Sequence, residues 1–412
     1  MPFIFAIETI VFLDSANISY ATLTMSTDLH FSAAVFGLGA GIFFIGYVLF
    51  QIPISIFAEI KSTRKLVALL LLTSGLISIA TSFINSDWQF YLVRFALGAS
   101  MAGIFPALVI YSSHWFRARE RATVFSILIS ATAFSQIIAG PISTQMLMIN
   151  WLGSEGWRWL FILQAMPAIV MAPITYFVMT NRPRNAKWLS QDDIGRLEIE
   201  IEAEKRASSA SYGYSWKKAI REKEVMTLTA VYALWLAAAY GLLFFIPTLI
   251  SEMKIFALPD IGLIVAAISI AGFASLILTG ISSDRKKERK AHAFVPLVIG
   301  ALALLGCFLA YGNNITMTII LLAVAVSGIG AGFGVFWTLP TLFLSEKSAA
   351  VSIGFIGTVG SIGGFFGPAV TGYLKATSGS FVTSSFFIVV LALVAAGLIL
   401  TLKSIKKTVL LE

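Results

Sequence analysis

The chain has 412 residues, of which 58% are hydrophobic and only 12% are charged. A soluble protein is roughly a quarter charged, so this composition excludes a large soluble enzyme and a nucleic-acid-binding protein. The single cysteine, Cys307, cannot pair within the chain, which excludes a disulfide-stabilised scaffold. The mean hydropathy of +0.88 indicates a membrane protein instead, because one bilayer span takes about 20 apolar residues.

Twelve apolar runs follow one another along the chain, in two sets of six separated by one long hydrophilic segment. The first set covers residues 3–24, 33–58, 66–84, 89–115, 122–147 and 157–180. The second set covers residues 225–250, 260–282, 293–311, 315–344, 349–374 and 381–402. This pattern predicts an all-α integral membrane protein with 12 transmembrane helices in two pseudo-repeated six-helix halves. The predicted domains are an N-terminal half at 1–180, a cytoplasmic central loop at 181–224, a C-terminal half at 225–402 and a cytoplasmic tail at 403–412.

The basic residues predict which side of the membrane each loop faces. If the N-terminus lies inside, 25 of the 29 Lys and Arg residues fall in cytoplasmic segments. Because positive charge resists translocation, both termini are expected in the cytoplasm of a multi-pass plasma (inner) membrane protein. The net charge of +8 therefore reflects topology rather than a nucleic-acid partner. No basic residue precedes the first run and no cleavage site follows it, so we expect no signal peptide.

The two halves repeat each other at a nearly fixed offset. The segment at 55–65 (SIFAEIKSTRK) follows the second run, and the segment at 280–290 (GISSDRKKERK) follows the eighth run, 225 residues later. Both place a carboxylate near a helix end and two basic residues five and six positions further on. Duplicated six-helix halves are typical of secondary transporters, in which two units rock around a site near the bilayer midplane.

These paired segments resemble the signature loops of the major facilitator superfamily, the second copy more closely than the first. Further segments resemble the anion:cation symporter branch, which includes phthalate-type and sugar-acid permeases and sialin-like carriers. They are residues 12–19 (FLDSANIS), 43–53 (FFIGYVLFQIP), 156–162 (GWRWLFI), 181–189 (NRPRNAKWL), 336–341 (FWTLPT) and 363–368 (GGFFGP). The resemblance implies an alternating-access secondary transporter for a small organic anion, with a proton as the coupling ion and no other cofactor.

Asp14 lies near the middle of the first run, and Asn17 follows it on the same helical face. A charged residue in the bilayer core costs at least about 2.5–3.5 kcal/mol on insertion scales, so each such residue is a functional candidate. In a cavity that opens alternately to the two sides, Asp14 is predicted to bind and release the coupling proton. The alternative is a static carboxylate held by hydrogen bonds or an ion pair.

Arg94 is the only basic residue placed deep within a run. Its guanidinium offers a planar pair of donors that matches a carboxylate, and the resemblance implies a substrate contact at this position. The alternative is an internal partner for Asp14, and the two roles are compatible if the substrate competes with Asp14 for Arg94.

Four positions depart from the branch pattern. Ser15 stands where the branch has Arg, Met101 where it has Glu, and Gly357 and Ser361 where it has Asn. One cation and one carboxylate are therefore absent together. This loss favours a monoanion, less hydroxylated or partly aromatic, and leaves an uncoupled facilitator or exchanger of a monocarboxylate as an alternative.

Neutral side chains are expected to complete the substrate site. The candidates are Tyr47, Asn17, Thr132, Gln136, Tyr240 and Trp337. Each of them also has a simpler reading as a helix-packing or interfacial residue. Glu8 lies near the predicted inner end of the first run. We expect it to extend toward the interface, as charged residues at span ends commonly do. The alternative is that Glu8 replaces the carboxylate that the branch pattern has and this chain lacks.

The paired loops predict a conformational latch that holds the halves in one state. Its candidate residues are Glu59, Arg64, Asp284, Arg285 and Arg289. The alternative is that these charges only set the topology.

Other function classes fit the sequence less well. His30, His114 and His292 are scattered at loops or run ends and form no metal-binding spacing with Cys307. No phosphate-binding Gly-rich motif is present, so neither an enzyme nor an ATP-driven pump is expected. Efflux of an amphiphile or drug is the main competitor to anion uptake, and a solute-sensing transceptor is a remote alternative. The predicted partners are the small anion and the lipid bilayer, and the protein is expected to be a monomer.

Overall fold

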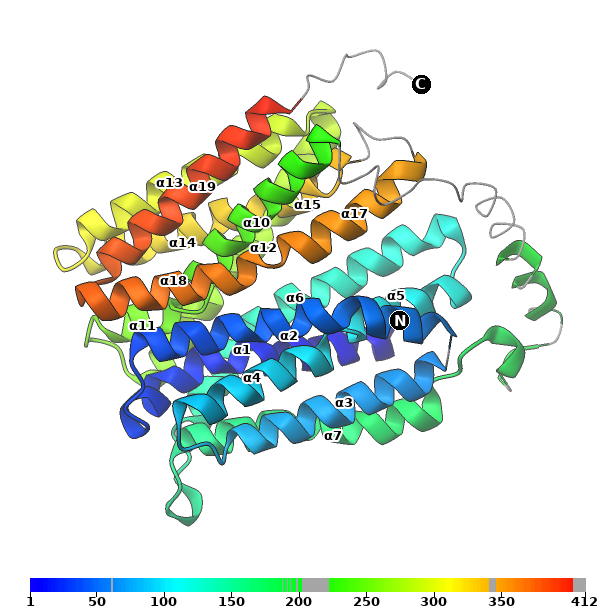
Figure 1. The fold of residues 1–412 in the computed structure, drawn as a ribbon, viewed down its shortest axis with the longest axis horizontal. Helices are drawn as coiled ribbons and strands as arrows, with labels where there is room; N and C mark the ends of the chain where they lie inside the picture. Colours follow the sequence, from blue (N-terminus) through cyan, green and yellow to red (C-terminus); the bar gives the residue numbers. More distant parts are fainter. Residues whose placement is uncertain are drawn as a thin grey trace. The chain divides into compact units, whose positions relative to one another are not determined.

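The computed structural model describes most of the chain, including all twelve predicted spans over most of their length. The described residues are 1–60, 62–186, 188–190, 192, 194–197, 199–201, 222–340 and 346–402, and the side chains of residues 59, 118, 119, 122 and 346–351 are not described. Twelve of its helices, taken with short continuations, are long and apolar enough to cross a membrane. The predicted all-α fold with 12 spans is confirmed (Figure 1).

The first six spans end near the predicted limits. Their helices are α1 (Pro2–Asp28), α2 (Ala33–Ile60), α3 (Thr63–Thr81), α4 (Asp87–Met101), α5 (Ile104–Trp115), α6 (Ala118–Met146) and α7 (Gly156–Val178). Helix α3 packs along α7 and against α4. Helix α3 begins after Ser62, a residue type that favours the N-cap position, and the Ser62 hydroxyl accepts a hydrogen bond from the Lys65 amide.

The last six spans are built in the same way. Their helices are α10 (Lys223–Leu243), α11 (Ile246–Ser251), α12 (Leu258–Lys286), α13 (Lys290–Ala310), α14 (Ile315–Ala331), α15 (Phe333–Phe336), α17 (Glu346–Gly360), α18 (Gly363–Ser378) and α19 (Phe381–Thr401). Helix α13 packs on α14 and α19, and α10 packs on α18 and α19. Among the described residues, short 3₁₀ turns lie at Trp151–Gly153, between α6 and α7, and at Pro183–Asn185, between α7 and α10.

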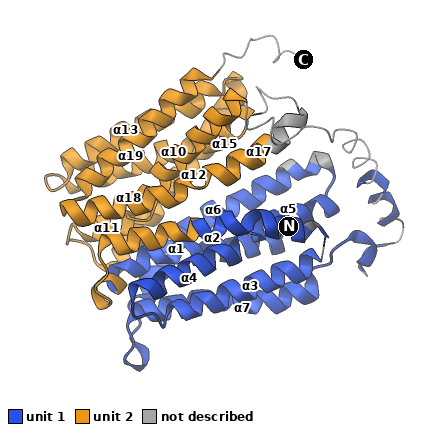
Figure 2. Cartoon of the chain, in the orientation of Figure 1, with its two compact units in different colours: residues 1–24, 45–212 blue, residues 25–44, 213–412 orange. Residues whose placement is uncertain are grey.

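The chain divides into two compact units that do not coincide with a simple cut in the central loop (Figure 2). Unit 1 holds residues 1–24 and 45–212, and unit 2 holds residues 25–44 and 213–412. The glycines of α2 explain why this helix contributes to both units. A Cβ on Gly37 would lie 2.3 Å from the Pro368 carbonyl oxygen of α18, whereas one on Gly46 would lie 2.2 Å from the Phe95 carbonyl oxygen of α4.

Several spans are interrupted where the sequence places small residues and proline. The fourth span breaks at 102–103, between α4 and α5, where a Cβ on Gly103 would meet the Ile54 side chain at 2.0 Å. The eleventh span breaks at 361–362, between α17 and α18. Irregular backbone at membrane depth is tolerated where protein or a lined cavity surrounds it.

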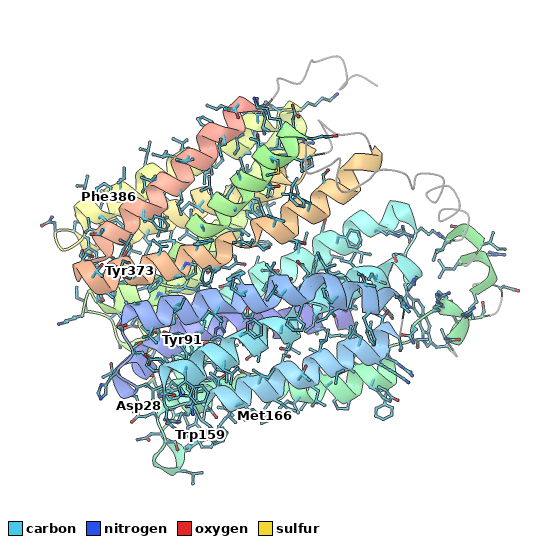
Figure 3. All side chains as sticks on the ribbon, viewed as in Figure 1. Asp28, Tyr91, Trp159, Met166, Tyr373 and Phe386 are labelled. Carbon is cyan, nitrogen blue, oxygen red and sulfur yellow. The ribbon has the colours of Figure 1, made fainter. Side chains whose placement is uncertain are left out.

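The outer surfaces of the helices carry large apolar side chains. Met166, Tyr373 and Phe386 project from α7, α18 and α19 (Figure 3) and are 40%, 60% and 57% exposed. Exposed apolar surface of this kind fits a hydrocarbon surrounding.

Candidate functional site

Asp14 is completely enclosed within unit 1, in the middle of α1. Its side chain is 1% exposed. The Ser78 hydroxyl of α3 donates to Asp14 Oδ1 at 2.6 Å, and Asn17 Nδ2 donates to the same oxygen at 3.0 Å. The other carboxylate oxygen, Oδ2, accepts no hydrogen bond from the described residues. Asp14 Oδ1 is therefore held by two hydrogen bonds, and Oδ2 can still accept a hydrogen bond or a proton.

Arg94 lies in unit 1 as well and brings a positive charge into the range of Asp14. It is on α4, 1% exposed, and its guanidinium interacts electrostatically with Asp14. A buried charge is costly unless an opposite charge compensates it. The two residues compensate each other, and the guanidinium can also bind a carboxylate from a solute through two parallel hydrogen bonds.

The Asp14 site depends on helical spacing in α1 and α3. Asp14 and Asn17 are three positions apart, so the bond between them is the neighbour contact that the sequence predicts. Ser78 was not among the predicted site residues. A signal for it exists in the sequence, because Ser74, Ser78 and Ser82 follow one another at four-residue spacing along one face of an otherwise apolar span.

Glu8 does not extend toward an interface as predicted. It is 1% exposed, and its Oε2 atom accepts no hydrogen bond from the described residues. The neighbouring turn of α1 packs against α6, where the Ser135 hydroxyl donates to the Thr9 carbonyl oxygen at 3.1 Å. Helix α1 begins at Pro2, so Glu8 lies two turns inside the helix and not at its end.

The other predicted site residues of unit 1 lie on α2 and α6. Tyr47 on α2 and Thr132 and Gln136 on α6 are all half-buried. Among the described residues, neither Thr132 nor Gln136 forms a side-chain hydrogen bond with Asp14. Their part in substrate binding stays a prediction.

The two predicted residues of unit 2 belong to aromatic clusters. The Tyr240 ring lies 4.6 Å from that of Phe44 and 5.7 Å from that of Phe244. The Trp337 ring lies 4.9 Å from that of Tyr232 and 5.4 Å from that of Phe336. These clusters offer flat apolar surfaces with few hydrogen-bonding groups.

The predicted latch residues are seen only in part. Arg289 Nη1 lies 2.5 Å from Asp284 Oδ1, which forms an ion pair within the second signature loop. Arg285 is exposed, and Arg64 of the first loop lies over the Tyr176 ring at 5.1 Å. The side chain of Glu59 lies outside the described part of the chain. The latch itself stays a prediction.

No group of three or more His, Cys, Asp or Glu residues suited to a metal ion occurs within the described ranges. Among the described side chains of unit 1, the buried charged groups are the carboxyl groups of Glu8 and Asp14 and the guanidinium of Arg94.

Comparison with known proteins identifies the family of the chain. The family model described as Major Facilitator Superfamily matches residues 4–368. A "Putative tartrate transporter" of Agrobacterium vitis is 37% identical, over 98% of this chain and 92% of its own length. A "Quinolone resistance transporter" of Acinetobacter baumannii is 31% identical, over 97% of this chain and 92% of its own length.

A solved structure supports the fold. The inward-facing, unoccupied crystal structure of a bacterial homologue of the human lysosomal transporter Spinster matches with a TM-score of 0.80. It is 18% identical, and the match covers 97% of this chain and 96% of that one.

Proposed function

Since the chain belongs to the major facilitator superfamily, we propose that this transporter takes up a small organic anion together with a proton by alternating access. The observation that carries the proposal is the buried carboxylate of Asp14 within electrostatic range of the buried guanidinium of Arg94. A membrane span has no need of this pair for its own insertion, because each charge adds to the cost.

The pair gives a physical reason for coupling. When the carboxylate of a solute binds Arg94, an ionised Asp14 becomes a second negative charge beside the same cation. A proton on Asp14 removes this repulsion, so the proton and the anion favour each other's binding. Ser78 and Asn17 orient one oxygen of Asp14, and the proton would bind the other oxygen.

Two observations support the substrate class: the charged residues left in the spans after the replacements at Ser15 and Met101, and the names of the relatives. The most similar relatives named above include one described as a putative tartrate transporter. Ser15 and Met101 replace a cation and a carboxylate of the branch pattern, and Met101 is buried. The tartrate-type relative supports an organic acid in general, since tartrate carries two carboxylates. One buried guanidinium matches one carboxylate, so for this chain we expect a monocarboxylate such as a sugar acid or an aromatic acid.

The direct test is uptake into proteoliposomes of a panel of sugar acids, aromatic acids and short carboxylates, with and without an inward proton gradient. Gradient-dependent accumulation of one acid is expected. In Asp14→Asn, accumulation should be lost while exchange of labelled substrate across the membrane continues. Full accumulation in Asp14→Asn would remove Asp14 from the coupling role. Equilibration without accumulation in the wild type would identify an uncoupled facilitator or exchanger.

A recognition test concerns Arg94. In Arg94→Lys the charge remains but the paired donors are lost, so the Km for the acid should rise about ten-fold or more. An unchanged Km would argue that Arg94 serves only as the partner of Asp14.

Efflux of an aromatic amphiphile is the second candidate. The relative described as a quinolone resistance transporter and the aromatic clusters around Tyr232, Trp337 and Tyr240 support it. Expression in a drug-sensitive host separates the candidates, because efflux raises resistance to such compounds and anion uptake does not.

We also propose that the protein lies in the plasma (inner) membrane with both termini in the cytoplasm, as the distribution of Lys and Arg predicts. Reporter fusions at the two termini, one active only in the cytoplasm and one only outside, test this orientation.

A further inference from the structure

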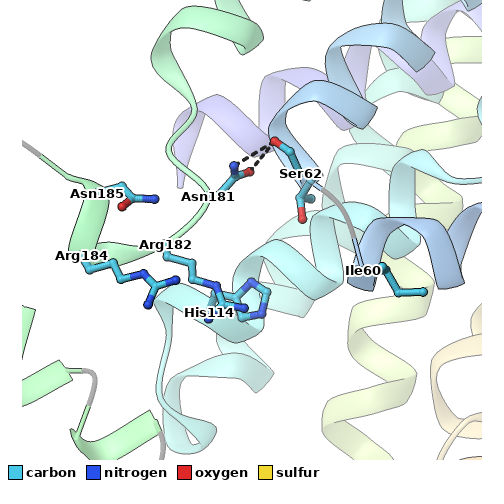
Figure 4. A pocket seen from close by; sticks show the side chains of 8 residues that line it. Ile60, Ser62, His114, Asn181, Arg182, Arg184 and Asn185 are labelled. Carbon is cyan, nitrogen blue, oxygen red and sulfur yellow. Dashed lines mark hydrogen bonds between the residues drawn. The ribbon is translucent and has the colours of Figure 1, made fainter.

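A polar hollow of about 300 Å³ lies in unit 1, far along the sequence from Asp14 and Arg94. It is bounded by the end of α2, the start of α3, the end of α5 and the segment after α7 (Figure 4). Its lining consists of Ile60, Ser62, Thr63, His114, Asn181, Arg182, Arg184 and Asn185. The volume is at the lower end of the range of about 300–1,000 Å³ that small-molecule sites occupy.

Asn181 holds the two sides of the hollow together. Its Nδ2 donates to Ser62 Oγ at 2.8 Å, and its Oδ1 accepts from the Arg64 amide at 2.9 Å. These bonds, shown in part in Figure 4, fasten the segment after α7 to the first turn of α3, 119 residues away. Thr63, the first residue of α3, lines the hollow, so the positive end of a 19-residue helix dipole faces it.

The lining residues that the structure describes are basic or neutral, and none of them is a carboxylate. Neither Arg182 nor Arg184 forms an ion pair within the described part of the chain. Arg64, the next base along α3, is directed toward the Tyr176 ring instead. The amides of Arg64 and Lys65 at the start of α3 already donate to Asn181 and Ser62, so the two guanidinium groups are the anion contacts that this hollow offers to a phosphate group.

Apolar surface borders the hollow on two sides. At the end of α2, Ile60 is 72% exposed and Phe57 49% exposed. At the end of α7, Phe177 and Val178 are 78% and 61% exposed, four and three residues before Asn181. A ligand that binds both the basic hollow and these apolar helix ends has an anionic head and an apolar tail.

A tryptophan pair marks the level of the membrane surface here. The rings of Trp115 and Trp188 stack at 5.6 Å, and Trp188 is 70% exposed. Tryptophan is enriched at the boundary between acyl chains and headgroups. The distribution of Lys and Arg predicts that this end of the helices faces the cytoplasmic leaflet, which carries acidic lipids in many membranes.

We propose that this hollow binds the phosphate group of an acidic phospholipid, with Arg182 and Arg184 as the anion contacts. Its acyl chains would then cover the exposed ends of α2 and α7. The hollow is lined by residues other than the buried Asp14 and Arg94, so the proposal does not depend on the transported substrate. It rests on the proposed orientation, with this end of the helices at the cytoplasmic leaflet.

The test is lipid binding to the full-length, detergent-purified chain by native mass spectrometry. The probes are phosphatidylglycerol and phosphatidylcholine with identical acyl chains. Charged residues near a lipid surface contribute about 1 kcal/mol each, so the double variant Arg182→Gln/Arg184→Gln should bind phosphatidylglycerol about 30-fold more weakly. The matched control is Arg196→Gln, because Arg196 is exposed on the same segment but does not line the hollow. The control should keep wild-type preference for phosphatidylglycerol.

Three further results test the proposed phospholipid site. Arg182→Lys/Arg184→Lys should keep part of the preference, since the charge remains, and this outcome separates lost charge from a misfolded loop. Equal loss of preference in the Arg196→Gln control would overturn the site. Millimolar sn-glycerol 3-phosphate or inorganic phosphate could also displace phosphatidylglycerol as effectively as added phosphatidylglycerol does. That result would overturn the proposal of a lipid ligand and identify a site for soluble phosphate.

Discussion

The Ser78 hydroxyl of α3 donates a 2.6 Å hydrogen bond to the carboxylate of Asp14 in α1, across 64 residues of sequence. This bond ties the proposed proton site to a helix that carries no charged residue near its middle. Helix α3 in turn packs against α4, which carries Arg94. Three helices of unit 1 therefore fix the geometry between the carboxylate and the guanidinium.

Replacement of Ser78 by alanine should weaken both the site and the fold. The buried carboxylate oxygen loses one of its two donors, which costs about 1–3 kcal/mol. The expected results are a lower melting temperature in detergent and reduced gradient-driven accumulation, because Asp14 is no longer held in one orientation. Circular dichroism and proteoliposome uptake measure the two effects.

The matched control for this variant is Ser74→Ala. Ser74 is equally buried, one turn earlier on α3, but its hydroxyl donates to the Leu71 carbonyl oxygen within its own helix at 3.0 Å. Wild-type accumulation in Ser74→Ala and in Ser78→Ala alike would mean that the hydrogen bond to Asp14 has no part in transport.

The spans and the Asp14–Asn17 contact could be predicted because they depend on local patterns. Apolar runs of about 20 residues predict membrane spans, and a separation of three residues predicts neighbours on one helix. The partnership of Ser78 with Asp14 depends on how α1 and α3 pack, which one sequence does not specify. The attachment of residues 25–44 to unit 2 likewise depends on backbone contacts at Gly37 and Gly41.

Glu8 was predicted wrongly for a related reason. Its position near the start of an apolar run indicated a span end, and the helix does begin at Pro2, within one residue of the predicted limit. The side chain is nevertheless 1% exposed, because this part of α1 packs against α6, and one sequence does not specify that packing.

Replacement of Glu8 by glutamine should leave the protein at least as stable as the wild type. Burial of an ionised carboxylate without a partner costs far more than burial of a neutral amide of the same shape. We expect an equal or higher melting temperature, and gradient-driven accumulation should persist because Asp14 remains. Loss of accumulation in Glu8→Gln with the melting temperature unchanged would move the coupling role to Glu8.

The turn between α12 and α13 should weaken in acid. Glu288 Oε1 accepts from the Ala291 amide at 2.7 Å, and Oε2 lies 2.8 Å from His292 Nδ1. Partial burial raises the pKa of Glu288, but the hydrogen bonds from Ala291 and His292 outweigh it and hold this pKa below its ordinary value. The stabilisation is therefore present above the ordinary value of about 4.3 and is lost as the pH falls through the lowered pKa.

The measurement is the melting temperature of the wild type and Glu288→Gln between about pH 7 and about pH 3, which extends below the ordinary pKa of Glu. The variant should be less stable at neutral pH, and the difference should shrink at the acid end. Glu155→Gln is the control, because Glu155 is exposed and caps no helix with its side chain. A difference that stays constant with pH would mean that the charge of Glu288 contributes nothing.

The contact between α2 and α18 should tolerate no added methyl group. A Cβ on Gly37 would lie 2.3 Å from the Pro368 carbonyl oxygen and 2.9 Å from the Gly372 Cα, and both are backbone atoms that cannot rotate away. Overpacking of this kind costs about 1–3 kcal/mol, so Gly37→Ala should melt at a lower temperature and be recovered in lower yield.

Gly397→Ala on α19 is the control, since nothing lies within 4 Å of its added Cβ. The control should be neutral or stabilising, because alanine favours a helix over glycine by about 1 kcal/mol. Equal stability of the two variants would show that α2 and α18 do not approach this closely.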